Sequence, residues 1–282
     1  MKKQYILLSI SFSLLFFLFF FAKTTHKKNN AATVAEKSTL PTFSIENYIA
    51  QEKAKLTPER SIYVTTLENS VKRGDVLAQQ IKANMGLASF YKDTLKLFEP
   101  YVFYYINAAK LENSEKNLTF AARLILTNLR GEQDEAKLAW KTNQAITLFA
   151  RAIQAAPNDD ELKIDLGSAY IYGKGRNGNA AETMEGIKTL LEVARKDSNN
   201  IRAQLMLGVG GVVSGQYDKA IERLKKVAAA NPNNVEAIAY LADAYAGKAN
   251  KQEAIKWYNI SKRLINDPHY TEEVEQRIKK LK

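Results

Sequence analysis

Few residues in this chain of 282 have the types and spacing that chemistry requires. There is no cysteine, which excludes thiolate zinc sites, disulfides and cysteine nucleophiles. The two histidines, His26 and His269, lie at opposite ends of the chain, so a paired metal site is not expected. No serine–histidine–aspartate set or carboxylate pair stands out either. We therefore predict a protein that is not an enzyme and uses no metal or cofactor.

One glycine-rich, basic segment could suggest phosphate binding. Residues 173–179 read GKGRNGN, but they lack the Gly-Lys-Ser/Thr ending and the preceding strand of a P-loop. We interpret this segment as a loop insertion.

The charge distribution argues against a nucleic-acid partner. Five lysines and no acidic residue lie in residues 1–30, which leaves +6 of the net charge of +11 for the rest of the chain. Acidic and basic residues are interspersed there, whereas nucleic-acid-binding domains gather basic residues on one face. Arg277, Lys279, Lys280 and Lys282 form a basic cluster at the end of the chain, and we interpret it as a solvated last helical turn.

The N-terminal region resembles a membrane anchor. Residues 5–22 carry no charge over 18 positions, close to the lower limit of about 17–25 residues for a spanning helix. The run ends at Phe21-Ala22-Lys23, a poor cleavage site, so residues 1–22 are predicted to be an uncleaved signal anchor, with a cleaved signal and a secreted or periplasmic product as the alternative. Lysines flank both sides almost equally. We expect the N-terminus inside and the body outside the cytoplasm, in the periplasm of a Gram-negative bacterium.

The remaining sequence reads as helices. Residues 23–43 are mostly polar and are predicted to be a flexible tether. Residues 44–75 are predicted to form a helical hairpin, with Ser44 as a cap and Pro58 in the first turn of the second helix. Residues 76–111 suggest two more helices, and their aromatic stripe of Tyr101, Phe103, Tyr104 and Tyr105 is expected in the core.

An internal repeat dominates the C-terminal part. Residues 201–234 and 235–268 align at an offset of 34, which pairs Leu207-Gly208 with Leu241-Ala242 and Ala220-Ile221 with Ala254-Ile255. Each unit reads as two helices. A similar unit with an expanded connection covers residues 160–200, and another second helix carries Ala145, Phe149 and Ala152.

With this period and these positions, the sequence resembles the tetratricopeptide repeat family. The resemblance implies an all-α fold, a right-handed superhelical array of antiparallel helix pairs. We expect about four units over residues 76–268 and a capping helix at 269–282. Together with the predicted transmembrane helix, the chain looks like a bacterial envelope-anchored tetratricopeptide repeat protein.

The resemblance implies a protein-binding groove lined by the first helix of each pair. The function expected is a membrane-anchored scaffold or adaptor, with a holdase-type envelope chaperone as the alternative. The groove composition favours an apolar or amphipathic segment of a partner and argues against a carboxylate clamp, because Arg202 stands alone. Residues 43–62 could instead fill the groove. The expected groove residues are Glu161, Ile164, Ser168, Ile171, Tyr172, Arg202, Leu205, Val209, Val212, Val213, Glu236, Ala239, Asp243 and Ala246.

Two adjacent glycines depart from the family pattern. Gly210 and Gly211 lie where the pattern has larger residues, and a glycine costs about 0.8–1 kcal/mol against alanine inside a helix. Either close approach of a neighbouring chain or drift in a tolerant repeat would explain them.

Overall fold

The computed structural model describes residues 42–73, 76–178 and 180–282, and this part of the chain is all-α. Its elements are α2 (Ile45–Ala54), α3 (Pro58–Arg73), α4 (Leu77–Ser89), the π-helical turn η1 (Phe90–Thr94), α5 (Phe98–Glu112), α6 (Glu115–Leu129), α7 (Glu135–Ala155), α8 (Asp160–Ala169), the π-helical turn η2 (Tyr170–Lys174), the 3-10 turn η3 (Gly175–Asn177), α9 (Ala180–Lys196), α10 (Ile201–Val213), α11 (Tyr217–Ala230), α12 (Val235–Gly247), α13 (Lys251–Ile265) and α14 (Pro268–Leu281).

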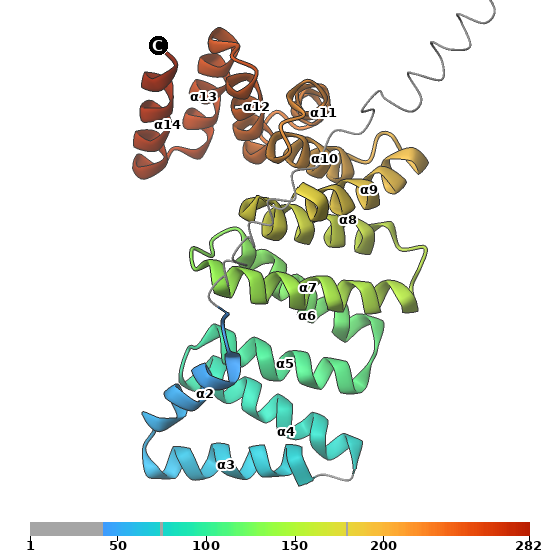
Figure 1. Cartoon of the computed structure of the whole chain (residues 1–282), viewed down its shortest axis with the longest axis vertical. Coiled ribbons are helices and arrows are strands. Elements are labelled where there is room, and N and C mark those ends of the chain that lie inside the picture. Colours follow the sequence, from blue (N-terminus) through green and yellow to red (C-terminus); the bar gives the residue numbers. More distant parts are fainter. Residues whose placement is uncertain (1–41, 74–75, 179) are drawn as a thin grey trace, which may run out of the picture. The chain divides into compact units, whose positions relative to one another are not determined.

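The helices from α4 onward stack as antiparallel pairs in chain order (Figure 1). The pairs are α4–α5, α6–α7, α8–α9, α10–α11 and α12–α13, and the second helix of each pair also packs against the first helix of the next. The described residues therefore hold five pairs, whereas the sequence suggested about four. The difference is the aromatic-rich pair at 77–112. Of its predicted aromatic stripe, Tyr104 is buried, and Tyr101, Phe103 and Tyr105 are partly buried and pack against the core.

The period of the sequence is visible in how the repeats begin. Asn200 and Asn234 lie one repeat apart and cap α10 and α12 in the same way. Each side chain accepts a hydrogen bond at 2.9 Å from the backbone N–H three residues later. Such a cap satisfies one of the free amide groups of a first helical turn and contributes about 1 kcal/mol.

Small residues lie where two helices of a pair cross. A Cβ atom on Gly208 would lie 2.6 Å from Cγ of Leu224, and one on Gly211 would lie 3.0 Å from Cβ of Ala220. Gly210 would similarly meet Ile171, from the preceding pair, at 2.8 Å. Close approach of neighbouring helices therefore explains both unusual glycines.

The glycine-rich segment at 173–179 is not the loop that the sequence suggested. Residues 170–177 continue α8 as η2 and η3, and Gly173 is buried against α7. A Cβ atom on Gly173 would lie 2.1 Å from Oγ1 of Thr142, and one on Gly175 would lie 2.7 Å from Val213. These two glycines permit close packing between helices.

The two N-terminal helices, expected as a hairpin at 44–75, pack on different neighbours. α3 packs along α4, whereas α2 packs against α5. The ring of Phe43, just before α2, lies 5.5 Å from that of Trp140 in α7. Residues 43–54 thus cover the α5–α7 region, and none of the groove residues expected at 161–246 contacts them through a ring or polar interaction.

No helix of the described residues is long and apolar enough to cross a membrane. The predicted anchor at 1–22 and nearly all of the predicted tether at 23–43 lie outside the described residues.

The last helix closes the stack. Val274 and Ile278 of α14 are buried against α13, while the outer side of α14 is polar. Arg277 is not merely solvated, as the sequence suggested, because its Nη1 lies 2.7 Å from Oδ1 of Asp243 in α12. Burial alone would lower the pKa of Arg277, but the Asp243 carboxylate, together with the Tyr258 and Glu273 side chains, outweighs burial and raises the pKa above its ordinary value.

Candidate functional site

The first helices of the pairs share one surface, which we call the first-helix face: the exposed and half-buried side chains of α6, α8, α10 and α12. The structure divides the expected groove residues between this face and the core. Ile164, Ile171 and Val209 are completely buried, and Ser168 and Tyr172 nearly so. The residues with accessible surface are Glu161, Arg202, Leu205, Val212, Val213, Glu236, Ala239, Asp243 and Ala246.

Direct contact between successive first helices explains the buried set. α8 packs against both α6 and α10, and α10 packs against α12. Side chains that would face an open groove in a looser stack are instead shared between neighbours. The expectation that Ile164, Ile171 and Val209 contact a partner is therefore wrong, whereas Leu205, Val212 and Val213 keep apolar area on this face.

The centre of the face is a line of ion pairs across three helices. Asp165 of α8 is 2% exposed, and its two carboxylate oxygens lie 2.6 Å from Nε of Arg123 in α6 and 2.8 Å from Nη2 of Arg202 in α10. Arg202 also pairs with Glu161. Burial raises the pKa of Asp165, and the Arg123 hydrogen bond only partly offsets it. A buried carboxylate is tolerated here because two guanidinium groups hold it.

Arg123 has capacity for a further ligand. Its side chain is 49% exposed, and only its Nε pairs with Asp165. The two terminal nitrogens have no partner among the described residues. A planar guanidinium with free donors is well suited to bind a carboxylate in two-point fashion.

An exposed aromatic ring lies beside Arg123. Phe120 comes one helical turn earlier on α6, is 51% exposed, and packs one side on Tyr105 at 5.2 Å between ring centroids. The sequence reasoning did not select α6 for the groove. The signal was present, since Phe120 lies in a stripe of otherwise polar residues with Lys116, Arg123 and Thr127, where an apolar side chain has no core to face.

A second cluster borders the face toward the C-terminus and joins three pairs. The Tyr172 hydroxyl donates to Glu236 of α12, and Arg130, at the end of α6, lies 3.0 Å from the same carboxylate and stacks over the Tyr172 ring. Burial and the Glu236 carboxylate together raise the pKa of Tyr172, so the phenol remains a donor. Tyr172 and Glu236, both expected in the groove, are thus brought together, and they stabilise the stack.

Asp243 is likewise engaged within the protein. It accepts a hydrogen bond at 2.6 Å from the Tyr258 hydroxyl in addition to its ion pair with Arg277. The acidic end that the sequence assigned to the groove is therefore largely neutralised by α13 and α14. In the described part of the chain, no group of acidic or histidine side chains has the arrangement of a metal site.

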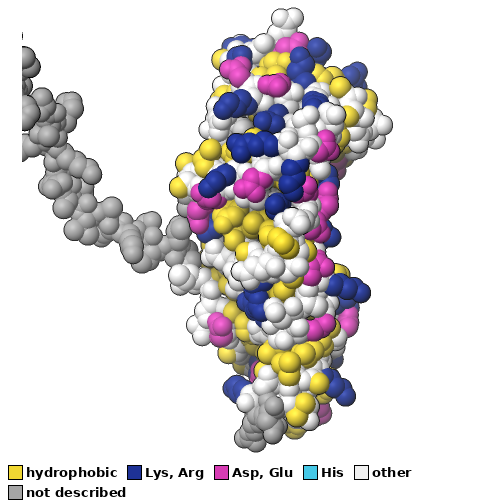
Figure 2. Space-filling view, turned by 90° about the vertical axis from the view of Figure 1, so that its right-hand side faces the viewer, with side chains coloured by type: hydrophobic (Ala, Val, Ile, Leu, Met, Phe, Trp, Pro, Cys, Tyr) yellow, Lys and Arg dark blue, Asp and Glu magenta, His cyan; other side chains and the backbone are white. Residues whose placement is uncertain are grey.

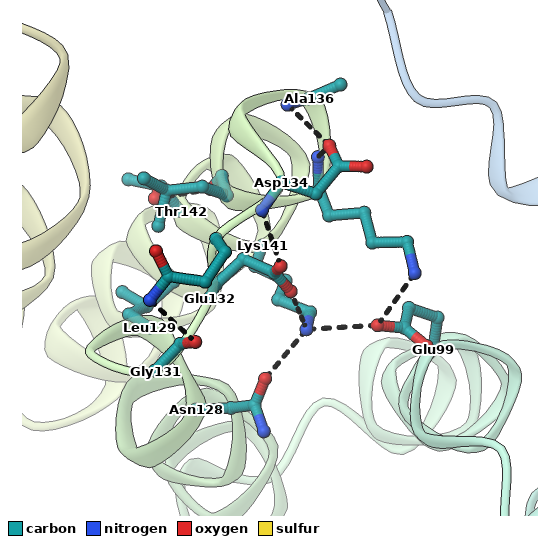
Figure 3. A network of polar contacts seen from close by, with 12 residues as sticks. Glu99, Asn128, Leu129, Gly131, Glu132, Asp134, Ala136, Lys141 and Thr142 are labelled. Atoms are coloured by element: carbon teal, nitrogen blue, oxygen red, sulfur yellow. Dashed lines mark hydrogen bonds and ion pairs between the residues drawn. The ribbon is translucent and has the colours of Figure 1, made fainter. Parts of the chain in front are cut away.

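A buried lysine fixes the connection between α6 and α7 (Figure 3). Nζ of Lys141 lies 2.6 Å from Glu132, 3.0 Å from Glu99 and 2.7 Å from Oδ1 of Asn128, and only 2% of the side chain is exposed. These contacts connect α5, α6, the turn between α6 and α7, and α7 itself. They hold α6, and with it Phe120 and Arg123, in a fixed position on the stack.

The side of the molecule drawn in Figure 2 carries charges of both signs. Basic and acidic side chains are interspersed there with apolar patches. This mixture differs from the continuous basic stripe of nucleic-acid-binding repeats.

Comparison with known proteins finds a family match in one part of the chain. Residues 214–270, which span α11 to α13, match the tetratricopeptide repeat family model. A thermophilic tetratricopeptide repeat protein from Thermus thermophilus superposes with a TM-score of 0.50 at 16% identity, covering 71% of this chain and 98% of that one. This likeness shows the fold alone.

Two further structures are similar at a lower level. A tetratricopeptide repeat protein from Parabacteroides merdae covers 84% of this chain and 92% of its own at 14% identity and a TM-score of 0.47. YrrB, described as a tetratricopeptide repeat protein with an unusual peptide-binding site, covers 72% and 98% at 14% identity and 0.45. No curated protein matches the chain.

Proposed function

We propose that this tetratricopeptide repeat protein is a scaffold that binds a segment of a protein partner on its first-helix face. The observation that carries the proposal is the pairing of Phe120, an exposed ring, with Arg123, whose terminal guanidinium nitrogens are free of partners in the described structure. Both project from a helix whose position is fixed by buried ion pairs. A prepositioned surface loses little entropy when it binds.

The side chains of the first-helix face indicate what kind of partner segment can bind there. Phe120 offers apolar area, and Arg123 offers donors for a carboxylate. The segment that fits is amphipathic, with an apolar side chain next to an acidic one. Such pairs occur on one side of a helix laid into a groove, at positions three or four apart.

Paired variants test this assignment. We expect Phe120→Ser and Arg123→Gln each to reduce recovery of the partner in a crosslinking pull-down from native membranes by about tenfold or more, because buried anchors at an interface contribute about 2 kcal/mol or more. Asp165 keeps Arg202 as its ion-pair partner in Arg123→Gln, so circular dichroism should show intact helix content.

The matched controls lie on α9, outside the face. Met184 is 45% exposed, and the Lys188 side chain is 72% exposed. Met184→Ser and Lys188→Gln should leave recovery unchanged. Equal losses from both pairs of variants would contradict the proposal, and recovery of many unfolded clients in place of one stoichiometric partner would favour a holdase-type chaperone.

We further propose that residues 5–22 attach the scaffold to a membrane, with residues 42–282 on the periplasmic side. The support is the uncharged run of 18 residues and the absence of a good cleavage site after it. A topology reporter fused after Lys282 tests the location. Activity of a periplasmic reporter in the membrane fraction is expected, whereas activity of a cytoplasmic reporter would reverse the orientation and a soluble product would remove the anchor.

A further inference from the structure

A groove runs between α3 and α4, and it shares no residue with the first-helix face. Its volume is about 560 Å³. Tyr63 and Leu67 of α3 line one side of it, and Met85 and Gly86 of α4 line the other. Tyr63 is 49% exposed and Met85 is 38% exposed. Large apolar side chains that are grouped and exposed on the surface of a protein commonly mark a binding site.

The place of α3 in the stack explains why this groove is open. Each of α5, α7, α9 and α11 packs against the first helix of its own pair and against the first helix of the next pair. α3 packs against α4 in the second of these ways, but no first helix of its own packs along it within the described residues, since α2 packs on α5 instead. Successive first helices from α6 to α12 also contact one another, so a further first helix would touch both α3 and α4.

The groove has the spacing of a helix contact. Tyr63, Leu67 and Ser70 line it at intervals of four and three residues, so they share one side of α3 over about two turns. The two helices are antiparallel, because a Cβ atom on Gly86 would lie 3.2 Å from Cδ1 of Leu67 while the Tyr63 ring lies 5.5 Å from that of Phe90. An occupant that matches this spacing is a helix with apolar residues three and four apart.

Charges at the two ends of the groove indicate the direction of the occupant. Lys82 lines the groove near the end of α3, is exposed, and forms no ion pair with another described residue. Glu59 lies near the start of α3, one turn before Tyr63. Helices favour acidic residues in the first turn and basic residues in the last. A helix whose acidic first turn lies at Lys82 therefore runs antiparallel to α3, as the helices do within the other pairs (Figure 1).

A second copy of the chain does not offer a matching helix. α14 packs on α13 as a first helix does, and no second helix follows it in the chain. Its Glu275 and Gln276 are exposed and lie one repeat of 34 residues after Leu241 and Ala242, which are buried. The side of α14 that would face a second helix is therefore polar, and it offers no apolar surface to α3 of another copy.

The segments before α3 in the same chain do not match either. α2 already packs on α5. The large apolar residues of 23–41 are Val34 and Leu40, six apart, whereas a helix laid into a groove uses apolar residues three and four apart. Residues 5–22 carry no acidic residue for Lys82. The occupant therefore comes from another protein.

We propose that the groove between α3 and α4 binds an amphipathic α-helix of another protein, which completes a further helix pair. Its acidic first turn lies at Lys82, and its basic last turn lies at Glu59. Its apolar residues, three and four apart, pack against Tyr63, Leu67 and Met85. The scaffold thus holds this helix independently of the segment bound on the first-helix face.

The test uses a first helix of the chain itself as the probe. The peptide of residues 234–248 has Glu236 in its first turn and Lys248 at its end, with apolar residues three and four apart at Ile238, Leu241 and Tyr245. Because the chain contains no cysteine, Ser89→Cys attaches an environment-sensitive dye at the groove of the full-length protein in phospholipid nanodiscs. We expect a saturable change in dye emission with a dissociation constant on the order of 100 µM, since a short peptide loses entropy when it becomes helical.

Variants of neighbouring residues locate the contact. Tyr63→Ser should weaken binding of the peptide about tenfold, because it removes the largest apolar side chain of the groove. Ile62→Ser is the matched control, since Ile62 is 68% exposed on the same helix but does not line the groove. Binding to Ile62→Ser should be unchanged, and circular dichroism should show intact helix content in both variants.

A charge exchange tests the direction of the helix. Lys82→Glu should weaken binding of the peptide about threefold, as expected for an exposed ion pair. The peptide that carries Glu236→Lys should bind Lys82→Glu about as well as the original peptide binds the parent protein. Failure of this exchange to restore binding would overturn the assigned direction.

Photocrosslinking identifies the natural occupant. A photoreactive phenylalanine analogue replaces Tyr63 or Ile62 in the full-length protein in native membranes. We expect one product with another protein from position 63, diminished by Lys82→Glu, and none from position 62. A product of two copies of this chain, a crosslink from position 63 to residues 1–41, or no product at all would overturn the proposal. So would the absence of a saturable dye change, or equal losses from Tyr63→Ser and Ile62→Ser.

Discussion

Lys141→Met is expected to destabilise the protein by about 3–5 kcal/mol, the range found when one partner of a buried ion pair is removed. Methionine can fill the space of the lysine side chain, whose Nζ lies 4.9 Å from the centroid of the Phe98 ring, so little of the loss would come from a cavity. The cost arises because Glu99 and Glu132, each with only 12% of the side chain exposed, would lose their buried cation. Urea unfolding of the full-length protein in detergent, followed by circular dichroism, measures it.

The destabilisation caused by Lys141→Met should become smaller as the pH falls. Burial alone would raise the pKa of Glu132, but the hydrogen bond and charge of Lys141, together with hydrogen bonds from the backbone N–H groups of Asp134 and Gln133, outweigh it, and the pKa lies below its ordinary value of 4.5. A carboxylate with a lowered folded-state pKa stabilises the protein above its unfolded-state pKa, and this contribution is lost as the pH falls through the folded-state value. Below that value Glu132 is protonated in the parent protein and in Lys141→Met. Glu132 then no longer contributes to the difference between their free energies of unfolding.

Lys137 provides the control for this prediction. It lies one turn earlier on α7, 3.7 Å from Glu99, with 27% of its side chain exposed. Lys137→Met should cost about 1 kcal/mol or less, as for other partly exposed pairs. Similar losses for the two variants, or a loss at Lys141 that does not change with pH, would contradict the account of Lys141 as the buried charge that fixes α6.

Gly173→Ala should destabilise the protein by about 2 kcal/mol although alanine is the better helix former. Helix propensity alone would favour alanine over glycine by about 1 kcal/mol inside a helical segment. The new Cβ would, however, lie 2.1 Å from Oγ1 and 2.3 Å from Cγ2 of Thr142. That side chain is buried and held by a 2.7 Å hydrogen bond to the Leu138 oxygen, so it cannot turn away freely. Overpacking of this kind costs about 1–3 kcal/mol or more, which outweighs propensity.

A double variant isolates the steric contact. Thr142→Ala removes the two closest atoms and leaves only Cβ of residue 142, at 2.7 Å, so Gly173→Ala made in that background should be less damaging by about 1 kcal/mol or more. Gly131→Ala serves as the control, because nothing lies within 4 Å of its added Cβ. Additive effects of Gly173→Ala and Thr142→Ala would contradict the packing explanation.

The sequence predicted the repeats best where the physical constraint is local to one pair. Gly208 and Ala220 recur one repeat later as Ala242 and Ala254, because two helices can cross closely only over small side chains. The asparagine caps follow the same period, since each free helix start needs an acceptor. These constraints repeat with the chain, so they leave a periodic signal.

The first-helix face was harder to predict because it depends on how closely successive pairs approach. Ile164 and Val209 occupy positions that would face an open groove, but contact between α8 and its neighbours buries them. Asp165 and Arg123 are 42 residues apart, and no periodic pattern marks that pair. The glycine-rich segment was misinterpreted for a similar reason, since Thr142, which requires Gly173 to be small, lies on another helix.

Site-specific photocrosslinking tests the central claim most directly. A photoreactive phenylalanine analogue is placed at position 120 on the first-helix face, or at position 184 on α9, in the full-length protein in native membranes. We expect one discrete crosslinked product from position 120 that Arg123→Gln diminishes, and none from position 184. Equal crosslinking from the two positions, or a product from position 184 alone, would contradict a partner-binding role for the first-helix face.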